Sequence, residues 1–208
     1  MFHQFIAKLL LLLAFVHVVT AQANPLQANT SQSNAEGKAN PTVKRIVVLA
    51  PHIVEMLYEI GAGNLIVGTT EHSDYPEAAL AIPRIGNYAK LNIEHVLSLA
   101  PDVVLAWKSG NPSDDVEKLR QLGMKIIYSQ PDALEDVAKE LRLFGKLVGH
   151  QRQAEQVAQA FENKLAALRQ RYQGKKPVSA FYELWSRPLT SVAGDAWPQQ
   201  QLAVCGID

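Results

Sequence analysis

Residues Leu91–Trp107, with the sequence LNIEHVLSLAPDVVLAW, constrain the fold more than any other stretch of the chain. Asn92 is a favourable N-cap, and an apolar face follows it at helical spacing. This face consists of Ile93, Val96, Leu97 and Ala100. Pro101 ends the helix, and Val103–Ala106 is a continuous apolar run typical of a strand buried on both faces. A helix that leads into such a strand predicts an α/β fold with a parallel sheet.

The same stretch offers two candidate sites. Trp107 directly follows the strand, and ligands of open α/β sheets bind beyond the carboxyl ends of the strands. Glu94 lies in the exposed first turn of the helix. A carboxylate there most often stabilises the helix dipole, but it could also accept a bidentate arginine from a docking partner.

The 208-residue chain has a formal net charge of zero and enough residues for one or two domains with a real core. A nucleic-acid-binding protein would normally need a basic face. The charge balance therefore argues against nucleic acid as a partner.

Residues 1–23 have the pattern of a cleaved secretory signal. Lys8 supplies a positive charge, Leu9–Val19 an apolar segment, and Ala21–Ala23 an A-x-A cleavage site. A transmembrane anchor is the alternative, but the apolar run is too short to span a bilayer. We therefore expect export to the periplasm, with residues 24–42 as a disordered polar leader.

Further alternation of strands and helices predicts an N-terminal α/β lobe over residues 43–133. Its additional strands are expected at Arg45–Ala50, Leu65–Thr69 and Lys125–Tyr128. Ser113 is expected to cap the helix before the last of these strands.

After Pro131 the pattern becomes helical, and we expect a helical segment over residues 134–174. It could be a surface helix of the same domain, a partner-binding helix or a rigid connector between lobes. Val178–Leu184 is predicted to form a new strand, so residues 175–208 would begin a second lobe.

Aromatic and histidine side chains are expected at the strand ends. A parallel sheet would bring their loops together in a mostly neutral crevice suited to a large, ring-rich ligand. Any single aromatic is more often a core or rim residue, so the prediction depends on their shared location. The candidates are His52, His72, Tyr88, Trp107 and, from the second lobe, Trp185.

No catalytic or metal site is predicted. The histidines lack the short, defined spacing of metal ligands, since His95 lies on the helix of Glu94, apart from His52 and His72. The sequence also contains no GxSxG elbow, Gly-rich phosphate loop or HExxH motif. We therefore expect a protein that is not an enzyme.

The segments KRIVVLAPHIVEMLYEIGA, VGTTEHSDYP and NIEHVLSLAPDVVLAW, followed by the long helix, resemble the helical-backbone (class III) periplasmic binding proteins. These are receptors of ABC importers for iron complexes and vitamin B12. SDYP at Ser73–Pro76 and AWKSGN at Ala106–Asn111 are most similar to the vitamin B12 (cobalamin) branch. The resemblance covers nearly all of Lys44–Asp208.

The resemblance implies two Rossmann-like lobes joined by a stiff helix, with cobalamin between them as transported ligand and no cofactor of the protein's own. It implies a monomer that delivers cobalamin to an ABC importer permease and ATPase complex. Glu94 would dock on the permease. The implied ligand contacts are His52, His72, Tyr88, Trp107 and Trp185.

Cys205 is the only cysteine, which in an exported protein suggests a free thiol, an intermolecular bridge or a missing partner. In the cobalamin branch the cysteine of a VCG motif, here Val204–Gly206, pairs with one near the C-terminus. The resemblance therefore implies that its partner and most of the second lobe are missing. We expect a fragment with weakened ligand binding.

Haem or an iron–siderophore complex is the alternative ligand within the same family. Tyr88 could then ligate iron. A siderophore receptor should show several arginines or other polar donors at the crevice, whereas only Arg84 and Arg187 are nearby. A metal-ion receptor would need a His-rich ligand set that the sequence does not show.

Overall fold

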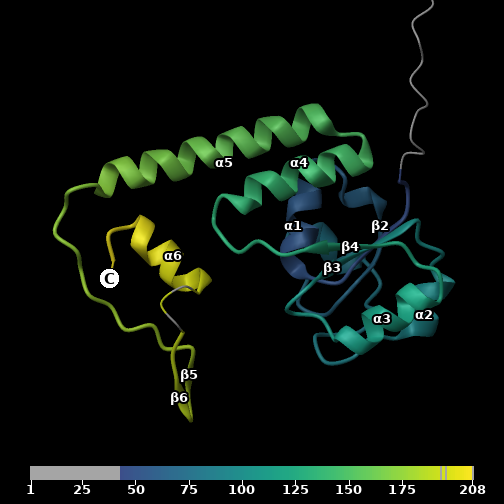
Figure 1. The fold of residues 1–208 in the computed structure, drawn as a ribbon. Helices are drawn as coiled ribbons and strands as arrows, with labels where there is room; N and C mark the ends of the chain where they lie inside the picture. Colours follow the sequence, from purple (N-terminus) through teal and green to yellow (C-terminus); the bar gives the residue numbers. More distant parts are fainter. Residues whose placement is uncertain (1–42, 193, 195, 208) are drawn as a thin grey trace, which may run out of the picture. The chain divides into compact units, whose positions relative to one another are not determined.

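The computed structural model describes residues 43–192, 194 and 196–207. The predicted signal peptide and leader, residues 1–42, lie outside the described residues. A four-stranded sheet has the order β2-β1-β3-β4, and all of its pairings are parallel (Figure 1). Its strands are β1 (Ile46–Val48), β2 (Ile66–Thr69), β3 (Val103–Trp107) and β4 (Ile126–Ser129). These strands confirm the parallel α/β arrangement predicted from the sequence.

Helices cover both faces of this sheet (Figure 1). Successive strand residues point to opposite faces, so Ile46 and Val48 belong to one buried cluster and Val47 to the other. The first face packs against α1 (Pro51–Glu59), α4 (Asp136–Val148) and α5 (Gln151–Tyr172). The second packs against α2 (Ile93–Ser98) and α3 (Ser113–Gln121). Burial on both faces explains why β1 and β3 are apolar without interruption.

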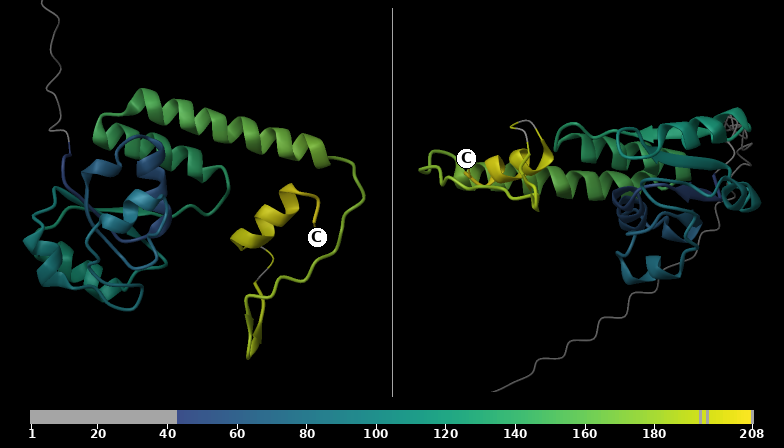
Figure 2. Two further views of the ribbon diagram at one scale, coloured as in Figure 1. Left: turned by 180° about the vertical axis from the view of Figure 1, so that it is seen from behind. Right: turned by 90° about the horizontal axis from the view of Figure 1, so that it is seen from below.

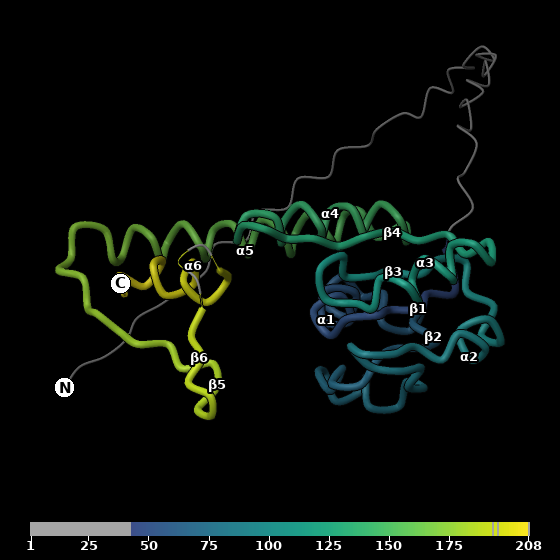
Figure 3. Tube along the Cα trace, turned by 60° about the horizontal axis from the view of Figure 1, so that its bottom comes forward, coloured from purple at the N-terminus to yellow at the C-terminus, as the bar shows by residue number. Residues whose placement is uncertain are grey.

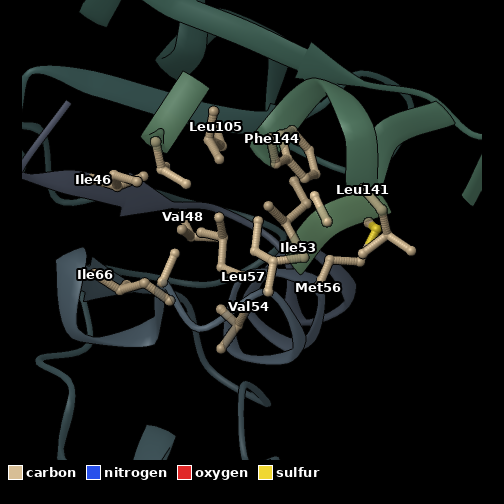
Figure 4. Close-up of a cluster of buried hydrophobic side chains, with 14 of the residues drawn as sticks. Ile46, Val48, Ile53, Val54, Met56, Leu57, Ile66, Leu105, Leu141 and Phe144 are labelled. Atoms are coloured by element: carbon tan, nitrogen blue, oxygen red, sulfur yellow. The ribbon is translucent and has the colours of Figure 1, made fainter. Parts of the chain in front are cut away.

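The larger core cluster lies between the sheet and α1 and α4 (Figure 4). Phe144 of α4 lies near Ile53 and Leu57 of α1, and all three side chains are fully buried. This packing fixes the start of α1, and hence His52, relative to the sheet.

The helix-to-strand unit at Leu91–Trp107 forms as predicted except at the end of the helix, where α2 stops at Ser98 and Ala100, predicted on the apolar face, is exposed with a φ of 44°. The Asn92 side chain accepts a hydrogen bond of 3.0 Å from the His95 backbone N–H, so it caps α2. Val103–Ala106 is completely buried, and Trp107 emerges from the sheet with 37% of its surface exposed. The unit therefore delivers Trp107 to the carboxyl edge of the sheet.

Helices α4 and α5 run alongside each other in both views of Figure 2. Gly149 ends α4 in a left-handed conformation, with φ of 81°, which glycine adopts without steric cost. The Arg142 guanidinium binds Glu155 and Glu162 of α5 at 2.6–3.0 Å. These ion pairs stabilise the packing of α4 against α5.

Short 3-10 helices η1 (Gly63–Leu65) and η2 (Glu77–Ala81) flank β2. One predicted cap is wrong: Pro112 occupies the N-cap of α3, and Ser113 is the first helical residue. Because the proline side chain has no hydrogen-bond acceptor, the helix begins without a side-chain cap.

The predicted strand Val178–Leu184 is also wrong. Val178 forms only an isolated bridge to Ile207, and the segment runs extended and exposed into the hairpin β5 (Trp185–Ser186) and β6 (Leu189–Thr190) (Figure 3). A strand requires a neighbouring strand, and within the described residues this segment has only that bridge and one further backbone hydrogen bond, from the Leu184 N–H to the Thr190 carbonyl at 3.0 Å. Helix α6 (Trp197–Val204) follows the hairpin.

Candidate functional site

A chain of hydrogen bonds links the start of α1 to the end of β4 and to α4. His52 Nε2 lies 3.0 Å from Ser129 Oγ. Ser129 in turn donates to Glu140 Oε2 at 2.6 Å, and the Gln130 backbone N–H donates to Glu140 Oε1 at 2.8 Å. Ser129 and Glu140 are both buried. The carboxylate is therefore satisfied at both oxygens although it lies inside the protein.

Burial also changes the protonation of this chain. Desolvation lowers the pKa of the His52 imidazole to about 4, so the ring is neutral at pH 7. Burial likewise raises the pKa of the Glu140 carboxyl, against the opposing effect of its bonds from Ser129 and Gln130. The site thus contains a neutral His52 that is linked through Ser129 to the buried carboxyl group of Glu140.

Trp107 lies beside His52, with ring centroids 5.5 Å apart and an interplanar angle of 83°. Aromatic rings favour this edge-to-face contact. The Trp107 ring also covers Gly110 so closely that a Cβ atom there would overlap it. The Asn111 side chain accepts a hydrogen bond of 2.6 Å from the backbone N–H of Trp107 and donates one of 2.7 Å to the Leu49 carbonyl. The loop therefore fixes the Trp107 backbone and packs Gly110 against the indole.

An open groove with a volume of about 350 Å³ lies along Trp107, on the side of α3 and β4. Its lining is mixed, with an aromatic at each strand end and polar groups from the loop and from α3. The lining residues are Trp107, Lys108, Asn111, Ser113, Val116, Glu117 and Tyr128. Such a groove offers apolar area together with a few polar contacts.

The loop after β2 carries His72, which is exposed and has a φ of 68°. The described residues show no hydrogen bond or ring contact between His72 and His52. Arg84 organises this loop by donating to the carbonyls of Ser73, Ala79 and Ile82 at 2.9–3.0 Å. Its guanidinium also lies 3.6 Å from Asp74, so Arg84 is a structural residue of the loop.

The remaining predicted aromatics are highly exposed. Tyr88 is 76% exposed on the turn before α2, and Trp185 is 66% exposed on the β5–β6 hairpin. The Trp185 indole N–H donates to the Arg187 carbonyl of the same hairpin at 3.0 Å. The structure thus brings together His52 and Trp107, while no ring contact within the described residues joins Tyr88, His72 or Trp185 to that pair.

Glu94 lies exposed in the first turn of α2, as predicted. Cys205 has a free thiol and is half-buried at the end of α6. Among the described residues, no group of three or more His, Cys, Asp or Glu side chains could hold a metal ion. In the same part of the chain, no helix is both long and apolar enough to cross a membrane.

Sequence reasoning missed Ser129 and Glu140, and it named Gly110 and Asn111 only as part of the Ala106–Asn111 motif. One signal was available: Glu140 is a charged residue four positions before the buried Phe144, on the apolar face of a predicted helix. A carboxylate on such a face requires a polar partner.

A family-wide sequence profile described as periplasmic binding protein matches residues 46–204. Among curated proteins, the vitamin B12-binding protein of Vibrio parahaemolyticus is 36% identical over 168 residues, which cover 81% of this chain and 61% of that protein. The vitamin B12-binding protein of Yersinia pestis is 32% identical over 163 residues, covering 78% and 58% respectively.

Solved structures have the same fold. The periplasmic vitamin B12 binding protein BtuF of Vibrio cholerae superposes with a TM-score of 0.75 and 36% identity, covering 80% of this chain and 65% of that one. The periplasmic heme-binding protein RhuT of Roseiflexus sp. RS-1 gives a TM-score of 0.70 and 25% identity, covering 79% and 65%. These likenesses confirm the predicted fold class.

The chain spans about three-fifths of the length of the curated relatives that it matches. The family profile nevertheless extends from β1 to the end of α6. The chain therefore belongs to the periplasmic binding protein family.

Proposed function

We propose that this chain captures vitamin B12 in the periplasm and delivers it to the permease and ATPase complex of an ABC importer. The observation that carries the proposal is the contact between Trp107 and the neutral His52 at the carboxyl edge of the parallel sheet. A neutral, partly aromatic surface at this position suits a large ring-bearing ligand that is bound mainly by contact area.

The electrostatics of the strand-end loops support cobalamin over an anionic iron complex. Arg84, a nearby arginine, already serves three backbone carbonyls and Asp74. Its donors are therefore engaged by the loop and are not directed at a ligand carboxylate. The relatives named vitamin B12-binding protein, at 32–36% identity, point to the same ligand.

We assign ligand contacts to five side chains and permease docking to one. Trp107 and His52 would form the floor of the site, and the exposed rings of His72, Tyr88 and Trp185 would close on the ligand. Glu94, exposed at the start of α2, would accept a permease arginine. In this proposal the protein is a monomer, catalyses no reaction and has no cofactor.

Haem is the second candidate. Lys108 follows Trp107 directly, borders the groove and forms no ion pair within the described residues. Its ammonium group could bind a haem carboxylate. The heme-binding relative from Roseiflexus keeps this alternative open, at 25% identity.

Titration calorimetry tests the choice of ligand. The purified chain is titrated with cyanocobalamin, haem and a ferric siderophore, with the Vibrio cholerae vitamin B12 binding protein as positive control. We expect saturable heat with cyanocobalamin alone. Binding of haem without cyanocobalamin would transfer the assignment to haem, and no binding in a preparation where the control binds would refute the proposal.

A further inference from the structure

The hydrogen bonds that link His52, Ser129 and Glu140 run in one direction, with the donor of each bond on the His52 side. Ser129 has a single hydroxyl proton, which it donates to Glu140 Oε2. It can therefore only accept from His52 Nε2, 3.0 Å away. While Glu140 is ionised, the neutral His52 must carry its proton on Nε2.

This tautomer leaves His52 Nδ1 as a hydrogen-bond acceptor. Within the described part of the chain, no hydrogen bond reaches Nδ1, and the ring is only partly buried. The ring also lies against Trp107, which we assign to the ligand site.

We propose that Glu140 and Ser129 are positioning residues that fix His52 as an acceptor, so that the site prefers ligands bearing N–H or O–H donors over ligands bearing carboxylates. This inference rests on the proposed function, because it requires the ligand to lie against His52. It narrows the ligand class to ring systems with neutral amide or hydroxyl groups. Cobalamin carries carboxamides around its ring, whereas haem carries carboxylates.

The three residues come from three separate elements. His52 is the second residue of α1, Ser129 the last of β4, and Glu140 lies in the first half of α4. Because Ser129 and Glu140 are buried beneath the site, neither is expected to touch the ligand. Their effect on selectivity would pass through the proton position of His52.

The proton position can be measured in the ligand-free chain. Long-range ¹H–¹⁵N NMR distinguishes the tautomers of histidine, and comparison with His52→Gln assigns the ring signals. The spectrum is recorded at pH 8, which favours the ionised carboxylate. We expect His52 to be protonated on Nε2; a proton on Nδ1, or an even mixture, would overturn the inference even if cobalamin binds.

Glu140→Gln should reverse the direction of these hydrogen bonds, because glutamine has nearly the same shape as glutamate. The introduced amide can accept from the Gln130 N–H and donate to Ser129, which then donates to His52 Nε2 and moves the ring proton to Nδ1. We expect the affinity ratio of cyanocobalamin to haem to fall by about 2- to 10-fold, the value of one neutral hydrogen bond. Glu55→Gln, an exposed change of the same kind on α1, should leave the tautomer and the ratio unchanged.

The outcomes separate this inference from the proposed function. An unchanged ratio in Glu140→Gln, despite a moved proton, would refute the selectivity role and leave the cobalamin assignment standing. Failure of the unaltered chain to bind either compound would refute both proposals, whatever the tautomer.

Discussion

Residues 43–148 and the described residues of 175–207 contain similar apolar side chains but bury them to very different extents. In the first region, Phe144 is completely buried between the sheet and α1. In the second, Phe181 and Trp185 remain 67% and 66% exposed. The difference lies in the neighbours: each face of the parallel sheet meets a helix layer, whereas the β5–β6 hairpin pairs only with itself among the described residues. Apolar composition creates a core only where backbone pairing brings two such surfaces together.

The largest expected effect comes from removing a ring in each region. Phe144→Ala should lower the free energy of unfolding by about 3–5 kcal/mol, because it leaves a cavity in the core. Phe181→Ala, the matched control, should change it by less than about 1 kcal/mol. Urea denaturation followed by circular dichroism measures both. Equal losses would contradict the contrast between the regions.

The next effect concerns pH and the buried polar chain. Because burial lowers the pKa of His52 from 6.5 to about 4, the unfolded chain takes up a proton first as the pH falls. The stabilisation from neutral His52 is complete above pH 6.5 and should be lost progressively towards pH 4, by about 2–3 kcal/mol.

His52→Gln provides the control for this measurement, since its amide can donate to Ser129 but does not titrate. The raised pKa of Glu140 acts in the opposite sense, stabilising the fold at low pH and less as the pH rises. Glu140 is present in both proteins, so its effect largely cancels in their difference. Parallel stability curves for the two proteins between pH 7 and pH 4 would exclude a buried neutral His52.

Ligand binding sharpens the comparison between the two tryptophans. Trp107→Ala should weaken cyanocobalamin binding by about 1–3 kcal/mol, because the loop holds this ring in place before the ligand arrives. Trp185→Ala should cost less, because its exposed side chain must be immobilised on binding. Calorimetry measures the affinity of both variants for cyanocobalamin. A larger loss of affinity in Trp185→Ala than in Trp107→Ala would contradict the assignment of Trp107 as the main contact.

Glu94→Ala should have the smallest effect on the molecule itself. We expect no change in ligand affinity or stability, because Glu94 is exposed and is not one of the proposed ligand contacts. Uptake of vitamin B12 should nevertheless fall in cells that depend on this protein. Glu55→Ala controls for loss of an exposed charge, and normal uptake by Glu94→Ala would argue against docking.

The sheet and its helices could be predicted because their signals are local. Asn92 precedes a helical apolar face, and Val103–Ala106 is apolar without interruption, so each stretch specifies its own element. The same reasoning failed for Val178–Leu184, where the pattern suits a strand but the described residues supply almost no partner. Strand formation depends on distant neighbours that periodicity does not reveal.

Only part of the candidate site could be predicted from the sequence, for the same reason. Strand ends indicated His52 and Trp107, which the structure brings to within 5.5 Å of each other. The support beneath them joins residues 77 positions apart in the case of His52 and Ser129. No spacing rule links such residues, although Glu140 on an apolar helix face signalled that some partner must exist.

The placement of Trp107 has an optical consequence. Its indole stands partly open to solvent at the site, next to an imidazole that is uncharged at neutral pH. A coloured macrocycle lying over this ring would quench its fluorescence by energy transfer, and it would also quench Trp185, which we assign to the same ligand. Tryptophan emission therefore serves as an intrinsic reporter of site occupancy, which allows capture and release to be followed in real time without a label.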